Sequence, residues 1–300
     1  MKKLQVIMSV LLLAMWVQAE TNRTFSMDFP RWAPSMRGGS VYNFETDMDQ
    51  GGAFSVNRYF IEGGITRMWS FDRMLSFSAG FGQDDYRFSD TAGRPWGNID
   101  NFRASVFGRW GLNEKWALFA APSVRSYGEA GTDLDDALTL AFFGGASYKF
   151  SDRLTLGPGL GVFERIEDDV RYYPIIIVNW AITDRLSLET GGGLAATAGP
   201  GLSLVYKVSK KWTTAVTTRY ESKRFRLNED GLAPNGVGED ESIPIVAQLT
   251  YFFYPQGLIS GVIGYSFGGS LSADDQNGNF LYETKYDPSP SIGIVASFRL

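Results

Sequence analysis

The sequence predicts an all-β fold, an antiparallel up-and-down β-barrel of about fourteen strands, with twelve as the fallback number. The first observation is composition: the 300 residues include 34 glycines and 15% aromatic residues but only 20% charged residues, a balance typical of strands and turns. The second is a period-two alternation of apolar and polar side chains in segments of about ten residues. The third is that short turns alternate with longer polar loops between those segments.

The chain begins with the features of a cleaved secretory leader. Lys2 and Lys3 precede an apolar run over residues 6 to 17, which ends at Val17-Gln18-Ala19. A signal peptidase recognises small or modest residues at such an end, so residues 1 to 19 are predicted to be a signal peptide. The structural alternative is a membrane anchor, but a helix needs roughly twenty apolar residues to cross a bilayer.

Short hairpin turns recur along the chain. In most of them an aromatic residue is followed by an apolar residue, two or three polar turn residues and a large apolar residue, as in Trp180-Ala-Ile-Thr-Asp-Arg-Leu186. Asp, Asn, Ser and Thr side chains bond their own backbone and favour such turns. The six predicted turns lie at 69–74, 110–116, 148–154, 180–186, 206–212 and 253–258.

The segments between the turns alternate as half-buried strands do. In 102–110, Phe102, Val106 and Trp110 share one face, and Arg103 and Arg109 share the other. The predicted strands are 39–46, 53–69, 74–87, 101–110, 116–126, 137–149, 154–164, 172–182, 186–195, 201–208, 212–225, 242–253, 258–269 and 289–300. Their other ends are joined by longer acidic loops, predicted at 85–100, 127–136, 164–171, 226–241 and 270–288.

Period-two alternation alone does not say which face of a barrel is apolar, and a soluble lipocalin-like barrel or a β-sandwich shows the same pattern. Four features favour a transmembrane barrel: the leader, the short turns opposite long loops, the aromatic residues beside the turns, and an amphipathic last strand. The predicted organisation is therefore a signal peptide at 1–19, an N-terminal periplasmic segment at 20–38, and a transmembrane β-barrel at 39–300.

These features resemble the outer-membrane β-barrel proteins of Gram-negative bacteria. The resemblance rests on the leader, on the repeated hairpins and on the terminal pattern Gly293-x-x-Ala296-x-Phe298. It implies a location in the bacterial outer membrane, contact with outer-membrane lipids, and a last strand similar to the signal read by the barrel-assembly machinery. The chain departs from that pattern in ending on Leu300, where such proteins commonly end on an aromatic residue. The resemblance is to an architecture and implies no particular activity.

Composition excludes most catalytic and cofactor chemistry. The chain has no Cys and no His, so imidazole catalysis, thiol chemistry and metal sites with His or Cys ligands are absent, and we expect no catalytic residues, metal or cofactor. An enzyme with a site of carboxylates alone is the remaining alternative. A net charge of −5 without a basic cluster also argues against nucleic acid as a partner.

If the apolar face meets lipid, the opposite face holds an excess of basic residues over Glu189 and Glu221. Two functions follow from that excess. One is a narrow channel for small solutes with a mild anion preference; the other is a plugged structural or surface-interaction barrel whose acidic extracellular loops bind a partner or cations. In the second case the inward charges pair with each other and with loop carboxylates. The candidate lumen-lining residues are Arg103, Arg109, Arg125, Lys149, Arg165, Lys207, Arg219, Glu221 and Lys223, with Arg299 of the same parity.

Overall fold

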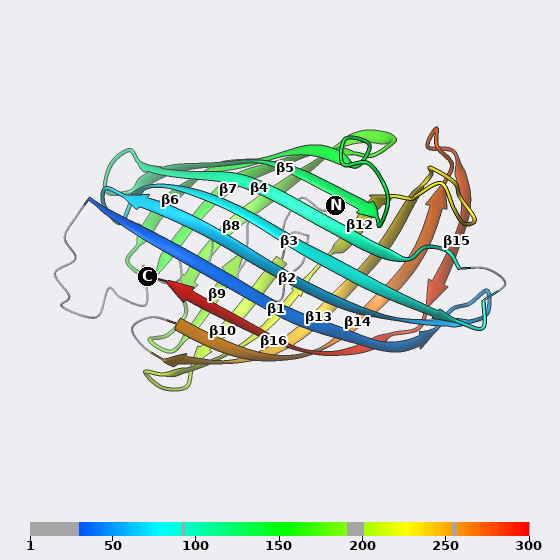
Figure 1. Ribbon diagram of the computed structural model, residues 1–300. Coiled ribbons are helices and arrows are strands. Elements are labelled where there is room, and N and C mark those ends of the chain that lie inside the picture. The colour runs from blue at the N-terminus through cyan, green and yellow to red at the C-terminus, as the bar shows by residue number, and fades with distance from the viewer. Residues whose placement is uncertain (1–29, 92–93, 191–200, 254–256, 300) are drawn as a thin grey trace.

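The computed structural model describes residues 30–91, 94–190, 201–253 and 257–299. The expected leader, most of the segment 20–38, and Leu300 lie outside these ranges. Within them the regular secondary structure consists of strands, and no helix is long and apolar enough to cross a membrane. Figure 1 shows the strands tilted around a closed wall.

Sixteen strands are defined over the described residues. They are β1 (Arg31–Asp47), β2 (Ala53–Met68), β3 (Arg73–Ser89), β4 (Asn98–Gly111), β5 (Trp116–Glu129), β6 (Leu138–Ser151), β7 (Leu154–Arg165), β8 (Asp168–Ala181), β9 (Leu186–Thr190), β10 (Gly201–Lys207), β11 (Trp212–Arg219), β12 (Glu221–Arg226), β13 (Val237–Phe253), β14 (Gly257–Asp274), β15 (Phe280–Tyr286) and β16 (Ser289–Arg299).

The wall is one closed antiparallel barrel of fourteen strands, as the sequence predicts. Consecutive strands from β1 to β11 pair with each other, β11 and β12 both pair with β13, and β13 pairs with β14. β15 and β16 both pair with β14, and β16 closes the ring on β1. The pairs β11 with β12 and β15 with β16 are therefore interrupted halves of single wall strands.

The structure corrects several predicted boundaries, among them that of the loop 226–241, within which β13 begins at Val237. β1 begins at Arg31, so residues 31–38 form part of the wall where the sequence suggested a periplasmic segment. The predicted loop 164–171 is a tight turn between β7 and β8, in which Glu167 adopts a φ of +48°. The predicted loop 270–288 contains the end of β14 and all of β15. In the loops a polar composition masked backbone pairing, because hydrogen bonds between strands do not depend on side-chain polarity.

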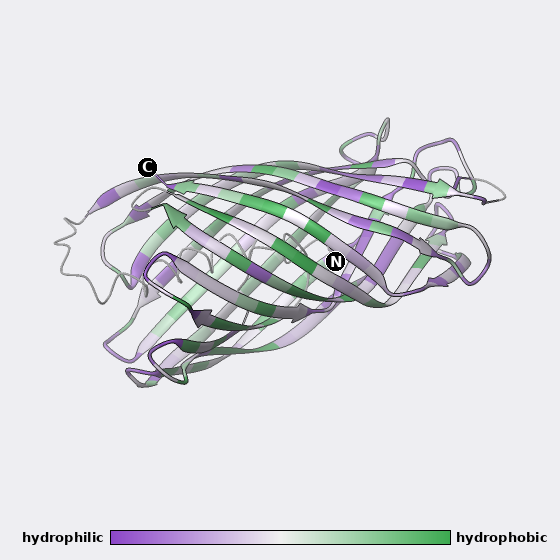
Figure 2. Ribbon diagram, turned by 90° about the horizontal axis from the view of Figure 1, so that it is seen from below, coloured by the Kyte–Doolittle hydropathy of each residue, from purple (hydrophilic) through white to green (hydrophobic). Residues whose placement is uncertain are grey.

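The outer face of the wall is apolar and carries two aromatic bands. One band lies beside the short turns and includes Trp69, Trp110 and Trp212, which are 44%, 52% and 41% exposed. The second lies toward the long loops and includes Phe44 and Phe267. Figure 2 shows hydrophilic residues concentrated in the turns and loops, with apolar and small residues along most of the strands between them. Two aromatic girdles around an apolar belt are the arrangement of an outer-membrane barrel.

β12 departs from the wall. A strand in a barrel wall exposes every second side chain, but Glu221, Ser222, Lys223, Arg224 and Phe225 are all buried. At its end, Arg226 forms a parallel bridge with Gly128 of β5, from which it is separated in the wall by the strands β6 to β10. β12 therefore turns inward across the mouth at the long-loop end, which is the extracellular end in barrels of this kind.

Candidate functional site: the barrel interior

Ion pairs between distant strands define the interior. Arg58 of β2 bonds Asp240 of β13 at 2.6 Å, and Lys223 of β12 bonds Asp84 of β3 at 2.6 Å. Neither pair of strands is adjacent in the sheet, so these side chains meet through the lumen. Of these four residues, Lys223 is the one that sequence parity assigned to the inward face.

The candidate lumen residues fall into two groups. Six of them are buried within the barrel, with exposed fractions of 8% or less: Arg103, Arg125, Arg165, Arg219, Glu221 and Lys223. Lys149, Lys207 and Arg109 lie instead near the short-turn end, where Lys149 and Lys207 are exposed and Arg109 is half-buried. Lys149 bonds Asp152 of the adjacent turn at 2.6 Å, and the side chain of Asp152 is 94% exposed. The Lys149 hydrogen bond holds the pKa of Asp152 below its usual value. The first group alone forms a site.

One hydrogen-bonding row of the sheet brings several of these charges together. In register across β1 to β6 stand, in order, Arg37, Glu62, Gly80, Arg103, Arg125 and Thr139. All of these side chains share the inward face, because register partners in a sheet project to the same side. The row thus contains three guanidinium groups and one carboxylate.

Glu62 is shared by two of the arginines in this row. Its Oε2 accepts a hydrogen bond from Arg37 at 3.4 Å and forms a close ion pair with Arg103. Arg103 reaches Glu62 from two strands away because Gly80 stands between them: a Cβ on Gly80 would lie 2.9 Å from the Ile61 carbonyl and 3.1 Å from Glu62 Cβ. The glycine therefore provides the space in which the ion pair forms.

A second cluster lies nearer the extracellular end. Asp240 accepts hydrogen bonds from Arg58 and from the hydroxyl groups of Tyr86 at 2.6 Å and Tyr286 at 2.9 Å. Arg58 also lies 3.5 Å from Asp84, which bonds Lys223. Two cations and two carboxylates thus alternate across the lumen from β2 and β3 to β12 and β13. This balanced cluster joins opposite sides of the barrel.

A third cluster forms on the other face of β12. Glu239 of β13 accepts hydrogen bonds from Arg165 of β7 at 2.8 Å and from Arg224 at 3.2 Å. Arg224 also bonds Asp274 at 2.6 Å and donates to the carbonyl of Ile166 at 2.7 Å. Arg219 and Glu221 pair separately at 2.9 Å. Most of the buried arginines are therefore neutralised by carboxylates.

These clusters correct the interior charge expected from sequence. Four further carboxylates, those of Glu62, Asp84, Glu239 and Asp240, are buried among the basic residues. Glu239 and Asp240 fall in a segment that the sequence assigned to an exposed acidic loop, and the structure places them in β13. The expectation of nine basic against two acidic interior residues is therefore wrong, and the interior is far closer to neutral.

Aromatic side chains fill the extracellular end of the lumen. Trp96, from the loop before β4, is 1% exposed and makes edge contacts with Tyr86 at 5.8 Å and Phe225 at 5.1 Å between ring centroids. The same cluster includes Tyr127 of β5 and Tyr286 of β15. Since its members come from β2 to β5 on one side and from β12, β14 and β15 on the other, the cluster crosses the lumen. Sequence reasoning missed Trp96 because it lies in a loop, where alternation carries no information.

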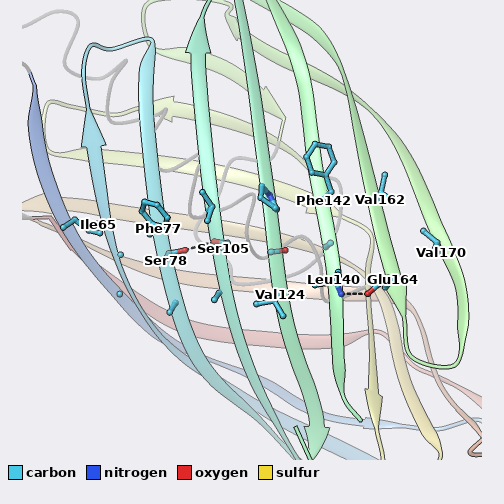
Figure 3. A pocket seen from close by; sticks show the side chains of 18 of the residues that line it. Ile65, Phe77, Ser78, Ser105, Val124, Leu140, Phe142, Val162, Glu164 and Val170 are labelled. Atoms are coloured by element: carbon cyan, nitrogen blue, oxygen red, sulfur yellow. Dashed lines mark hydrogen bonds between the residues drawn. The ribbon is translucent and has the colours of Figure 1, made fainter. Parts of the chain in front are cut away.

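Small side chains line the wall beside the row of arginines, on the side of the short turns. There the inner face carries small hydroxyl residues, with Ser78 bonded to Ser105 at 2.8 Å, and the outer face has a groove of about 1100 Å³ over β2 to β8. Figure 3 shows Phe77 and Phe142 among the side chains around this groove. Both are exposed, at 46% and 44%, so the groove opens on the lipid-facing surface.

Comparison with solved structures gives the same architecture. An outer-membrane channel from Pseudomonas putida F1 superposes over 93% of this chain and 100% of its own, with a TM-score of 0.50 and 11% sequence identity. A Pseudomonas aeruginosa FadL homologue covers 90% of each chain with a TM-score of 0.47 and 12% identity. No family model and no curated protein matches the sequence. At this identity the first similarity is one of fold, and together with the apolar belt and the two aromatic girdles it identifies an outer-membrane β-barrel.

Proposed function

We propose that the barrel is a narrow channel for small solutes with a mild preference for anions, and that the aromatic cluster around Trp96 narrows its extracellular end. The observation that carries the proposal is the inner face, where buried arginines and hydroxyl groups replace the apolar packing of a purely structural core. Polar groups are costly to bury, so a wall lined with them indicates a pathway for water and polar solutes. The channel from Pseudomonas putida that shares the fold is consistent with this proposal.

The anion preference rests on a small residual charge. Most interior arginines have carboxylate partners, so the expected preference is weaker than a count of basic residues suggests. Arg125 has no such partner among the described residues, and it supplies the excess. In a low-dielectric wall one uncompensated cation concentrates anions and repels cations.

The test is the conductance and reversal potential of the purified, refolded protein in a planar bilayer under a salt gradient. We expect small single-channel currents with a reversal potential on the anion side, and Arg125→Gln should move that potential toward zero. The matched control is Lys207→Gln, since Lys207 is an exposed cation at the short-turn end whose field is screened by salt. A clear cation preference in the wild type would contradict the proposal.

The second candidate function is a plugged structural or surface-interaction barrel. The aromatic cluster around Trp96 and the ion pairs that cross the lumen favour it, because together they join opposite sides of the wall. In this case the acidic extracellular loops would bind a partner or cations. Absence of any conductance, both in the wild type and after removal of the Trp96 side chain, would favour this function over the channel.

We also propose that the last strand directs insertion by the barrel-assembly machinery. Phe298 is 46% exposed on the outer face of β16. Ala296 lies two residues before it and so faces the same side of the strand. Gly293 lies between Val41 and Val262 on the flanking strands. Pull-down of the assembly machinery with a peptide of residues 289–300, compared with the same peptide carrying Phe298→Asp, tests this assignment.

A further inference from the structure

We propose that Arg125, with Arg103 beside it, forms a buried binding site for an oxyanion, the carboxylate or phosphate group of a small solute. The site lies on the inner face of β4 and β5, in the row that begins at Arg37. This inference names a class of solute for the channel proposed above, and it rests on that proposal only for the route by which the solute reaches the site.

In the part of the chain that the structure describes, the guanidinium of Arg125 is buried without a hydrogen-bond partner. The residue is 0% exposed, and its Nε, Nη1 and Nη2 atoms have no hydrogen-bond partner among the described residues. An arginine remains charged in proteins, so burial does not remove the charge by deprotonation. Burial of an ion without a counter-charge costs several kcal/mol even after the protein relaxes. A buried guanidinium with three unpaired nitrogens therefore points to a ligand that supplies acceptors and negative charge.

The surrounding charges require that ligand to be an anion. The charged neighbour of Arg125 in the row is Arg103, which has the same sign, and its other electrostatic neighbour is the hydroxyl of Tyr127. The carboxylate of the row, Glu62, is already shared by Arg37 and Arg103. The row therefore carries three positive charges against one negative charge. An anion placed at Arg125 reduces this imbalance and the repulsion between the two adjacent arginines.

The remaining interior carboxylates are engaged elsewhere. Asp84 bonds Lys223 at 2.6 Å, Glu221 bonds Arg219 at 2.9 Å, and Asp240 bonds Arg58 at 2.6 Å. Transfer of one of them to Arg125 would leave another buried cation uncompensated, at a similar cost. Within the described ranges these acids are therefore committed to other cations, and a carboxylate or phosphate from outside the chain avoids that exchange.

The shape of the groups favours an oxyanion over a simple halide. A guanidinium presents parallel N–H donors that match two oxygens of a carboxylate or phosphate. Thr139 is the register partner of Arg125 on β6, and Tyr127 lies two residues farther along β5 on the same face. Their hydroxyl groups extend the set of donors on both sides of Arg125. The site thus combines charge with directional hydrogen bonding.

The experiment measures binding of acetate and of inorganic phosphate to the refolded full-length barrel in detergent, by titration calorimetry at constant ionic strength. We expect one bound anion per barrel, and Arg125→Gln should weaken binding at least about tenfold, the loss expected for a hydrogen bond to a charged group. Arg125→Lys keeps the positive charge but lacks the parallel N–H donors of a guanidinium. It should therefore bind the anion more tightly than Arg125→Gln and less tightly than the wild type. Binding of either oxyanion supports the site and identifies the group that it prefers.

Arg87→Gln is the matched control, since it removes an arginine whose side chain is 75% exposed and should leave binding unchanged. If Arg125→Gln fails to fold, the wild type alone still tests the proposal: phosphate should raise its midpoint of thermal unfolding at constant ionic strength, as a ligand of the native state does. No binding by the wild type, or equal binding by Arg125→Gln, would overturn it. Conductance is measured separately, so binding without conductance refutes the channel and leaves the site standing.

Discussion

The guanidinium of Arg103 on β4 reaches the carboxylate of Glu62 on β2 across the bare backbone of Gly80 on β3. Three consecutive strands thus cooperate in one ion pair, which is buried on the inner face with both side chains less than 10% exposed. The relationship explains why a glycine stands in the middle of a strand, where it is otherwise unfavourable. Glu62 is the only carboxylate in the row from Arg37 to Thr139, and its ion pair with Arg103 leaves no carboxylate of that row for Arg125.

Glu62→Gln should destabilise the barrel by about 3–5 kcal/mol, because it leaves Arg37 and Arg103 buried without their counter-charge. The measurement is the free energy of urea-induced unfolding in detergent. Glu114→Gln, at an exposed position in a short turn, is the control and should have little effect. Equal stability of the two variants would mean that the ion pair contributes nothing measurable to the folded barrel.

Gly80→Val should separate Arg103 from Glu62, because the new side chain would occupy the space between them. The cost of such overpacking is about 1–3 kcal/mol, measured by the same unfolding experiment. Gly63→Val is a sharp control: Gly63 is on the neighbouring strand β2, and a Cβ there would meet no atom within 4 Å. A larger loss of stability for Gly63→Val than for Gly80→Val would contradict the role assigned to Gly80.

Trp96→Ala should increase conductance. Trp96 is among the largest fully buried side chains, and its removal opens the aromatic cluster that fills the extracellular end. Single-channel current in a planar bilayer is the readout. Trp110→Ala removes an equally large side chain, which is 52% exposed on the lipid-facing surface, and should leave the current unchanged. If both variants conduct as the wild type does, the cluster does not control the pathway.

Phe298→Asp should reduce the amount of assembled barrel several-fold, because it puts a charge on the outer face of the last strand. Ser297→Asp should be milder, since Ser297 faces inward and stands opposite Arg37 of β1 in register. Assembly is measured as the fraction of heat-modifiable protein in outer-membrane preparations. Equal yields from the two variants would show that the faces of β16 do not govern assembly.

The sequence by itself indicated an up-and-down barrel of about fourteen strands and, for strands that keep to the wall, the face that each side chain takes. Alternation along 102–110, for example, placed Phe102 outside and Arg103 inside, and the structure agrees, with exposed fractions of 44% and 7%. This works because the pleat of a strand sends successive side chains to opposite faces, and one face must meet lipid. Local periodicity therefore carries this information wherever a strand keeps to the barrel wall.

Only the tertiary structure decided which side chains meet inside the barrel. Lys223 and Asp84 are 139 residues apart in the chain and lie 2.6 Å apart in the lumen, and no local pattern relates them. Glu239 and Asp240 lie in a polar segment that the sequence assigned to a loop, so they were not recognised as interior acids. β12 turns inward, although alternation predicted a wall strand there. The physical reason is that alternation fixes a direction for each side chain but not its partner. Partners depend on barrel closure, strand stagger and bends, which combine contributions from the whole chain.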